Sequence, residues 1–488
     1  MTLRLCAAVV ALNVCAVAAD DPASVLARIL AEKGAISSAD VARVEAADAS
    51  QRVHVLAALL ANKGLLTATD LARLERGGEA APGAAASPVL ASQQPPAPRR
   101  EITTPPVTSQ TRSPVTVYGT LLFNAFEDTS LTNIQDIPLF AGKQGSDALG
   151  NDKSFGMTAR QSRLGMKYTG PDVAGARISG QVEVDFLGGK AAFGNGINMD
   201  LLRLRLAYGR LDWKNFALEA GQDWSVFAPL NPTTLAEFAI PGLSTSGNPW
   251  IRMPQLRAEF HGDLSDTTRV LFQAAAIDPD VGDYNTAVFS SGRTPGIGER
   301  GRAPGVDSRL GITTKADDRE FAFGLSGHYS RGKNAGAIGT NTIQAGLNSW
   351  GAAIDYSLPF SKWFAFSGEW YMGRALGIFS VASAESVLPV GTPGQYGVQS
   401  RGGWSQAQFN VTPKWQVNLS YGIESDLNRY LRVGDRDKNQ TYVGNLIYKY
   451  TQHVNFAWEW RRLLTNWKDQ RAADETGDHF NFAAAYIF

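Results

Sequence analysis

The sequence predicts an all-β antiparallel barrel of about sixteen strands that crosses a membrane, preceded by a short α-helical region. Three observations indicate this fold: short segments of alternating polarity, connections that are in turn long and short, and an aromatic last strand. In the final ten residues one parity is strongly aromatic, with Phe480, Phe482, Tyr486 and Phe488. The other parity is small or mixed, as a strand between lipid and a lumen requires. For this stretch alone, the last strand of a soluble β-sandwich is the alternative.

Composition narrows the classes of partner and of membrane segment. The chain has 488 residues and balances 46 basic against 46 acidic side chains. No global field therefore favours nucleic acid as a partner. Beyond the N-terminus no stretch offers the roughly 18 to 20 uncharged apolar residues that a membrane-spanning helix requires. We therefore expect an exported chain of this kind to be either soluble or a barrel.

Residues 1–19 have the organisation of a secretory signal peptide. Arg4 lies in a short basic region, an apolar run follows, and small residues precede Asp20. Both cysteines, Cys6 and Cys15, lie inside this segment. The mature chain is therefore predicted to contain no thiol and no disulfide.

Residues 20–76 contain a repeat, because residues 25–45 align with residues 55–75 after a shift of thirty positions. In the first copy, Leu26, Ile29 and Leu30 form an apolar stripe at helical spacing, and Ser37 can cap a second helix. Each copy is therefore predicted to form a helical hairpin. Two copies bury little surface, so we expect the region to need an oligomeric partner or another surface for stability, and to act as a structural or tethering segment.

A linker rich in proline and alanine follows at residues 77–114, and the barrel is predicted over residues 115–488. Sixteen alternating segments are expected near residues 115–126, 156–169, 176–187, 199–211, 216–223, 253–262, 268–277, 306–316, 321–330, 347–358, 363–374, 402–412, 415–425, 439–450, 453–463 and 479–488. An even number of strands with tight turns at one end is the plan of a bacterial barrel. The first tight turn is expected at Gly170-Pro171-Asp172.

Within the segments one parity is apolar and the other polar, and in one segment Leu202, Leu204, Leu206 and Tyr208 oppose Arg203 and Arg205. The apolar face would be the core of a soluble sandwich, but it faces lipid in a wide barrel. Aromatic residues decide between the two, because they gather beside the short turns at Tyr168, Trp213, Trp363, Trp415, Tyr448 and Tyr450. Such a belt is typical of the membrane interface.

The connection from Trp224 to Arg252 differs from the other long loops, because it is apolar, rich in proline and carries Glu237 as its single charge between the ends. By contrast, the loop at residues 278–305 is charged and is expected to be solvated. An exposed apolar loop would form a hydrophobic patch, so this loop should pack against something. The available surface is the inner wall of the barrel.

Charged residues occupy the lumen parity of the neighbouring segments, with alternating sign from strand to strand: Arg163, Lys167, Glu183, Asp185, Arg203, Arg205, Glu219, Arg257 and Glu259. Two interpretations stay open. In the first, Glu183 and Asp185 pair with Arg203 and Arg205 across neighbouring strands and neutralise the wall. In the second, excess arginines form a positive strip that faces Glu237 and orients dipolar solutes in a transverse field.

From about residue 115 to residue 488 the chain resembles the sixteen-stranded, trimeric general porins. In that family the third surface loop folds into the lumen, where an acidic residue faces a cluster of wall arginines. The resemblance implies a pore constriction made by Glu237, Arg163, Arg203, Arg205 and Arg257, together with Glu183, Asp185 and Glu219. The helical extension is more similar to that of the dicarboxylate-type trimeric porins, which carry a periplasmic helical stalk.

The aromatic ending resembles the C-terminal signal that the barrel assembly machinery reads in bacterial outer-membrane barrels, and this resemblance implies that role for Phe480, Phe482, Tyr486 and Phe488. The predicted protein is a homotrimeric porin in the bacterial outer membrane, with its N-terminal region in the periplasm. It would be a passive diffusion channel for small hydrophilic solutes. The alternative is a non-conducting outer-membrane barrel that anchors a periplasmic tethering segment.

Catalysis and cofactors are not expected. None of the five histidines stands in a motif with a serine nucleophile. Without cysteines or clustered histidines, no transition-metal site is predicted. Asp278, Asp280 and Asp283 either hold calcium or, as we prefer, solvate a loop.

Overall fold

The structure is a computed structural model that describes residues 22–32, 36–48, 51–63, 114–143, 153–189, 200–281, 295–338, 340–380, 386–468 and 474–488. The chain divides into two compact units, residues 1–86 and residues 87–488. The predicted signal peptide at residues 1–19 and almost all of the predicted linker lie outside the described residues. No helix among the described residues is long and apolar enough to cross a membrane.

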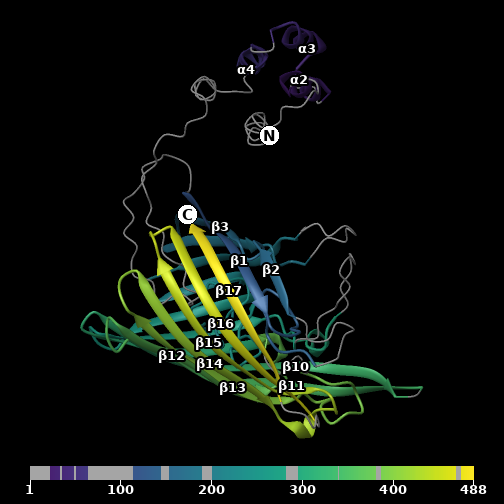
Figure 1. The fold of residues 1–488 in the computed structure, drawn as a ribbon, viewed down its shortest axis with the longest axis vertical. Coiled ribbons are helices and arrows are strands. Elements are labelled where there is room, and N and C mark those ends of the chain that lie inside the picture. Colours follow the sequence, from purple (N-terminus) through teal and green to yellow (C-terminus); the bar gives the residue numbers. More distant parts are fainter. Residues whose placement is uncertain are drawn as a thin grey trace. The chain divides into compact units, whose positions relative to one another are not determined.

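The described part of the N-terminal unit contains three helices, α2 (Pro22–Glu32), α3 (Ser38–Glu45) and α4 (Arg52–Asn62), drawn in purple in Figure 1. Their apolar stripes share one core, made by Ala27, Leu30, Ile36, Val44, Leu56, Ala57 and Leu60. Helices α2 and α3 form the hairpin predicted for the first repeat, whereas residues 64–76 of the second repeat lie outside the described residues.

Ser37 caps α3 as expected, because its hydroxyl accepts from the Asp40 N–H while the Asp40 carboxylate accepts from the Ser37 N–H at 2.9 Å. Lys63 also contacts that carboxylate, at 3.0 Å. The backbone hydrogen bond from Ser37, followed by the bond from Lys63, lowers the pKa of Asp40 to about 2. The cap therefore stays charged at any physiological pH.

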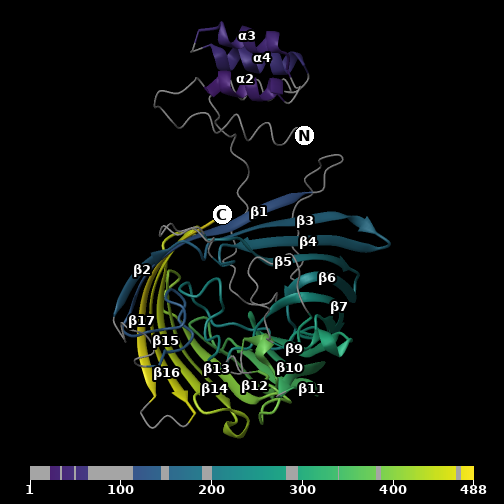
Figure 2. The ribbon, with the colours of Figure 1, turned by 90° about the vertical axis from the view of Figure 1, so that its right-hand side faces the viewer.

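The second unit is a single antiparallel sheet closed into a barrel, and Figure 2 shows the strands curving round to meet. Its strands are β1 (Val115–Asp128), β2 (Ser154–Thr158), β3 (Arg163–Val173), β4 (Ala176–Asp185), β5 (Arg203–Asp212), β6 (Phe216–Trp224), β7 (Arg252–Asp263), β8 (Thr268–Ile277), β9 (Gly305–Ala316), β10 (Arg319–Ile338), β11 (Asn341–Leu358), β12 (Phe364–Arg374), β13 (Gln399–Asn410), β14 (Trp415–Asp426), β15 (Arg436–Lys449), β16 (Val454–Trp467) and β17 (Glu475–Ile487). Within the described ranges of the long connections, single-turn 3-10 helices lie at Glu299–Gly301, Gly377–Phe379 and Asn428–Tyr430.

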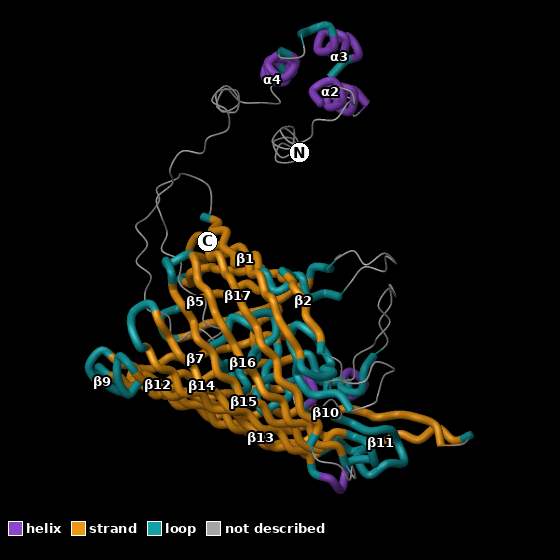
Figure 3. Tube along the Cα trace, viewed as in Figure 1, coloured by secondary structure: helices purple, strands orange, loops and turns teal. Residues whose placement is uncertain are grey.

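These seventeen segments make sixteen barrel strands, because β2 and β3 are two parts of one strand. Both parts pair with β1: β2 opposes residues 124–128 and β3 opposes residues 115–120. The predicted strand number and fold class are therefore confirmed. Strands β10 and β11 are longer than predicted, with 20 and 18 residues, and they project beyond their neighbours (Figure 3).

The first tight turn lies four residues later than predicted. Strand β3 continues through Pro171, and the turn is made by Ala174 and Gly175, whose φ angles are 51° and 74°. The register between β3 and β4 shifts between Thr169 and Asp172. Because Pro171 has no N–H to donate, it suits an irregular position in the ladder, so the Gly-Pro-Asp sequence marks a bulge and not a turn.

The side chains alternate as predicted in most strands, and the outward parity is apolar and exposed at residues such as Leu164, Leu419, Trp458 and Phe480. Strand β5 departs from the prediction after Arg205. The register against β4 pairs Val184 with Leu204 but Glu183 with Leu206, so Arg205 is an extra residue in a β-bulge.

The bulge reverses the parity of the rest of β5. Leu206 is buried, and the Tyr208 hydroxyl donates to Gln181 Oε1 at 3.0 Å. The prediction that Leu206 and Tyr208 share the outward parity with Leu204 is therefore wrong. A one-residue insertion turns every later side chain to the other face, because the side-chain period of a strand is two residues.

The barrel closes between β1 and β17, where Thr120 opposes Ile487 and Asp128 opposes His479. The last residue continues this ladder: the Phe488 N–H donates to Gly119 O at 3.1 Å, and the Gly119 N–H donates to Phe488 O at 3.0 Å. A Cβ atom on Gly119 would lie 2.6 Å from Phe488 Cζ. The terminal ring therefore covers a position that only glycine can occupy without a shift.

Deleting Phe488 should leave the protein exported but poorly inserted, because the deletion removes the last ladder pair and the ring that covers Gly119. Quantifying the folded protein in the outer-membrane fraction tests this. Phe272→Ala, which removes an exposed outward ring from β8, is the control. Wild-type membrane levels of the shortened chain would show that Phe488 is not needed for insertion.

Candidate functional site

The connection between β6 and β7, residues 225–251, is here called the inner loop. Every residue from Ser225 to Trp250 is buried except Pro229, Leu230 and Thr233, which are partly exposed. The loop bonds to inward-facing side chains on strands from both halves of the barrel, including β10, β12 and β16 as well as β3 and β5. Packing stabilises a loop of this composition, because its apolar side chains are then removed from water.

The loop begins at a buried polar network. Ser225 Oγ donates to Asp307 Oδ2 at 2.6 Å, Asp307 Oδ1 lies 2.7 Å from His328 Nδ1, and His328 Nε2 lies 3.1 Å from Ser349 Oγ. Phe227 packs above it against Phe379, with 4.7 Å between ring centroids. The network ties the start of the inner loop to β9, β10 and β11.

Asp307, His328 and Ser349 are the residue types of a hydrolase triad, and the sequence analysis did not connect them. Ser349 is fully buried, and its hydroxyl donates to Ala375 O at 2.9 Å. A nucleophile needs access to a substrate and a proton that the histidine can accept. This arrangement therefore suits a structural anchor.

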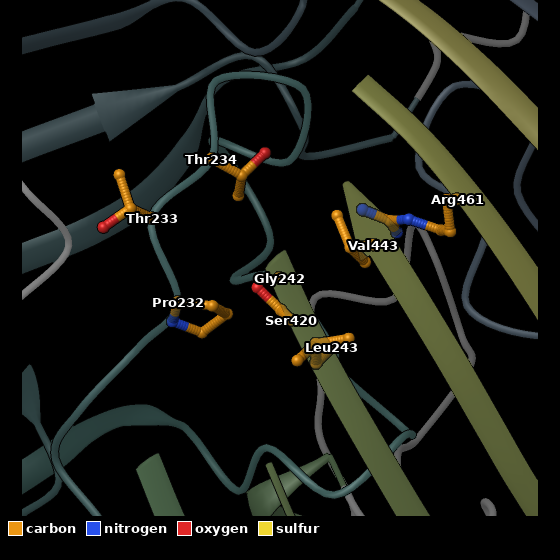
Figure 4. Close-up of a pocket in the computed structure, with 8 residues that line it drawn as sticks. All are labelled: Pro232, Thr233, Thr234, Gly242, Leu243, Ser420, Val443 and Arg461. Carbon is orange, nitrogen blue, oxygen red and sulfur yellow. The ribbon is translucent and has the colours of Figure 1, made fainter. Parts of the chain in front are cut away.

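The middle of the loop contacts the wall made by β13 to β16. Thr234 Oγ1 donates to Glu459 Oε2 at 2.5 Å, and Asn445 Nδ2 donates to Thr233 O at 2.9 Å. Figure 4 shows Pro232, Thr233 and Thr234 of the loop opposite Ser420, Val443 and Arg461 of the wall. The cavity between them measures about 10 Å³, which is room for one water molecule at most.

Glu237 forms an ion pair with Arg461 of β16, and Arg461 Nη2 also lies 2.7 Å from Glu459 Oε1. Both side chains of the Glu237–Arg461 pair are only 2% exposed. The sequence predicts Arg163, Arg203, Arg205 and Arg257 as partners of Glu237, and Arg461 was not among the predicted partners. Arg461 lies on β16, which is separated from β3 by β17 and β1, so the carboxylate meets a neighbouring part of the wall.

The expected arginines contact the loop through its backbone. Arg163 Nη2 donates to Phe238 O at 2.8 Å, Arg203 Nη2 donates to Ala239 O at 2.7 Å, and Arg205 Nη1 donates to the same oxygen at 3.0 Å. The residues after Glu237 thus present carbonyl groups to this wall. Carbonyl oxygens satisfy guanidinium donors without adding a charge.

The same arginines pair with the two carboxylates of β4. Arg205 contacts Glu183 at 2.7 Å and Asp185 at 2.9 Å, Arg203 contacts Asp185 at 2.6 Å, and Arg163 contacts Glu183 at 3.4 Å. The predicted cross-strand neutralisation is therefore present in the structure. These ion pairs neutralise most of the arginine charge that the positive-strip interpretation requires.

Arg257 belongs to a separate cluster. It contacts Glu219 at 2.6 Å, Asp223 at 2.8 Å and Glu259 at 3.0 Å, while Arg210 bridges Glu219 and Glu259. Arg257 Nη1 donates to Trp224 O, at the end of β6, over 3.2 Å. The structure therefore groups Glu219 and Arg257 together, but apart from Glu237.

The described residues contain no group of three or more histidine, cysteine, aspartate or glutamate side chains that could hold a metal ion. Of the three aspartates considered for calcium, Asp283 lies outside the described residues.

No family model matches this sequence, and no curated protein matches it. Among solved structures, the barrel is similar to the outer membrane channel DcaP of Acinetobacter baumannii, with a TM-score of 0.56 and 18% sequence identity over 78% of this chain and 99% of that chain. An anion-selective porin from Comamonas acidovorans follows, with a TM-score of 0.48 and 13% identity over 77% of this chain and 100% of that chain. The chain has the porin fold. At these identities the likeness concerns the fold alone.

Proposed function

We propose that this porin-fold chain is a passive diffusion channel for small hydrophilic solutes in the bacterial outer membrane. The inner loop would form the narrowest part of its pore, lined by Arg163, Arg203, Arg205 and Arg461. The observation that carries this proposal is that the Leu230 N–H donates to Glu369 of β12 while Ala239 O accepts from Arg203 and Arg205 of β5, on the opposite side of the closed sheet. A segment so attached reduces the cross-section that a solute can use.

Charge in this region supports a weaker form of the predicted transverse field. On β3 and β5, Arg163, Arg203 and Arg205 pair with the two carboxylates of β4, and Arg252 lies over the Trp224 ring, so these four guanidinium groups leave an excess of two positive charges. On β16, three strands from β3, Arg461 faces Glu237 and Glu459, which leaves one negative charge. Unlike charges across a narrow passage orient dipolar solutes.

We further propose that the barrel is a homotrimer, inserted by the barrel assembly machinery with its exposed apolar face in contact with outer-membrane lipid. The domain plan is a signal peptide at residues 1–19, a periplasmic helical region at 20–76, a linker at 77–114 and the barrel at 115–488. The shared core of α2, α3 and α4 supports a compact stalk or tether.

A second function is a non-conducting barrel that anchors the helical unit. The burial of the inner loop favours it, because the loop is bonded to both walls and leaves a cavity of only about 10 Å³ beside Arg461. Single-channel recording separates the two. Stable open steps support the channel, and a silent, folded barrel supports the anchor.

Shortening the inner loop between Leu230 and Ser246 should enlarge the single-channel current, because this segment carries the contacts to β12 and to β5 on opposite sides of the barrel. Shortening the charged loop at residues 278–305 is the control and should change the current little. An unchanged current in the first variant would place the limit to conduction elsewhere in the barrel.

Replacing Glu237 by Gln should shift the ion selectivity toward anions, because Arg461 then keeps only Glu459 as a neutralising partner. Reversal potentials in a salt gradient measure the shift. The double variant Glu237→Gln/Arg461→Gln removes both charges and should return toward the wild-type value. If the single variant keeps the wild-type reversal potential, Glu237 does not lie beside the ion path.

A further inference from the structure

Four basic residues line an open groove on the outside of the barrel. Arg300 and Arg302 come from the connection before β9, and Arg331 and Lys333 come from the projecting part of β10. The groove has a volume of about 440 Å³, and Asn348 and Leu347 of β11 complete it. In the register of the sheet, Arg331 opposes Asn348 and Lys333 opposes Gly346.

The groove faces away from the lumen. Along β10 the inward parity carries buried Ser326, His328, Ser330 and Asn334. Arg331 and Lys333 are exposed and share the other parity with Phe323, Leu325 and Tyr329, which are 53%, 59% and 43% exposed. A solute that passes through the pore would therefore not meet these cations.

The outward residues of β10 follow the polarity profile of a membrane surface. From the short turn toward the tip they run from apolar Phe323 and Leu325, through the aromatic Tyr329, to Arg331 and Lys333. Hydrocarbon, aromatic belt and charged headgroups succeed one another in this order. At about 3.3 Å per residue, Arg331 lies roughly 7 Å beyond Tyr329, at the depth where lipid headgroups begin.

The cations have no acidic partner within the described part of the chain. Arg331 Nε donates to the Tyr329 hydroxyl at 3.1 Å, and Glu299, the carboxylate of the same turn as Arg300, accepts from the Gly296 N–H at 2.7 Å. Four neighbouring positive charges repel one another, so a multivalent anion stabilises them. Guanidinium groups bind phosphate oxygens in pairs, whereas lysine adds a point charge.

We propose that this groove, made by Arg300, Arg302, Arg331 and Lys333, binds the phosphorylated headgroup of a lipid in the outer leaflet around the barrel. The proposal depends on the barrel lying in a membrane, and it is independent of whether the pore conducts.

Native mass spectrometry of the full chain in detergent, titrated with phosphatidic acid or with phosphatidylcholine, tests the proposal. The wild type should retain phosphatidic acid in preference to phosphatidylcholine. Arg331→Ser/Lys333→Ser should weaken retention at least about tenfold, from the usual contribution of each basic residue at an anionic surface. Arg269→Ser/Lys362→Ser, which removes two charges near the short turns, should leave retention unchanged.

Lys333→Arg preserves the positive charge and should retain phosphatidic acid as the wild type does. This control shows that a loss of binding in the serine variant comes from the lost charge and not from misfolding. Equal retention by the wild type and the Arg331→Ser/Lys333→Ser variant would overturn the proposal. So would displacement of the lipid by millimolar inorganic phosphate, since the groove would then be a site for a free anion. Single-channel current should be the same in all variants, so this result stands apart from the test of conduction.

Discussion

Closure of the sheet is the constraint on which the rest of this structure depends. In hydrocarbon each backbone N–H and C=O must find a partner within the protein, and an open sheet edge cannot provide one. The ladder between β1 and β17, extended by Phe488 against Gly119, removes the last free edge. Closing sixteen strands sets a wide circumference, and the interior of such a barrel is too large for wall side chains to fill.

The inner loop packs into this wide interior and supplies partners for charged side chains on its wall. Arginines and carboxylates on the wall are costly to bury unless each finds a partner. Glu183 and Asp185 satisfy part of the arginine cluster, and the carbonyl groups of Phe238 and Ala239 satisfy more of it. The loop, in turn, gains a dry surface for its apolar residues. Wall charge and loop position are therefore parts of one arrangement.

The sequence predicted the strands well because a period of two and recurring turn residues are local signals. It underestimated β10 and β11, since their projecting parts carry Arg331, Lys333 and Asn334 in place of apolar and polar residues in alternation. It missed the bulge at Arg205, which inserts one residue without any turn signal.

The partners of the inner loop could be predicted only in part. Charged residues on β3, β4 and β5 were recognised from their parity, and the structure brings them together. The pairing of Glu237 with Arg461, and the network of Ser225, Asp307 and His328, join segments that lie far apart in the sequence. Which inward residues meet the loop depends on the stagger of the closed sheet, and spacing along the chain does not encode that stagger.

The position of the inner loop is tested most directly by a cysteine pair at Ser246 and Thr441, whose hydroxyl oxygens lie 2.7 Å apart. The two natural cysteines, Cys6 and Cys15, lie in the predicted signal peptide. In the folded barrel the pair should form a disulfide and lose its reactivity toward a maleimide reagent, and reduction should restore that reactivity. Two thiols that stay reactive in the folded, oxidised protein would contradict a loop held against β15 inside the barrel.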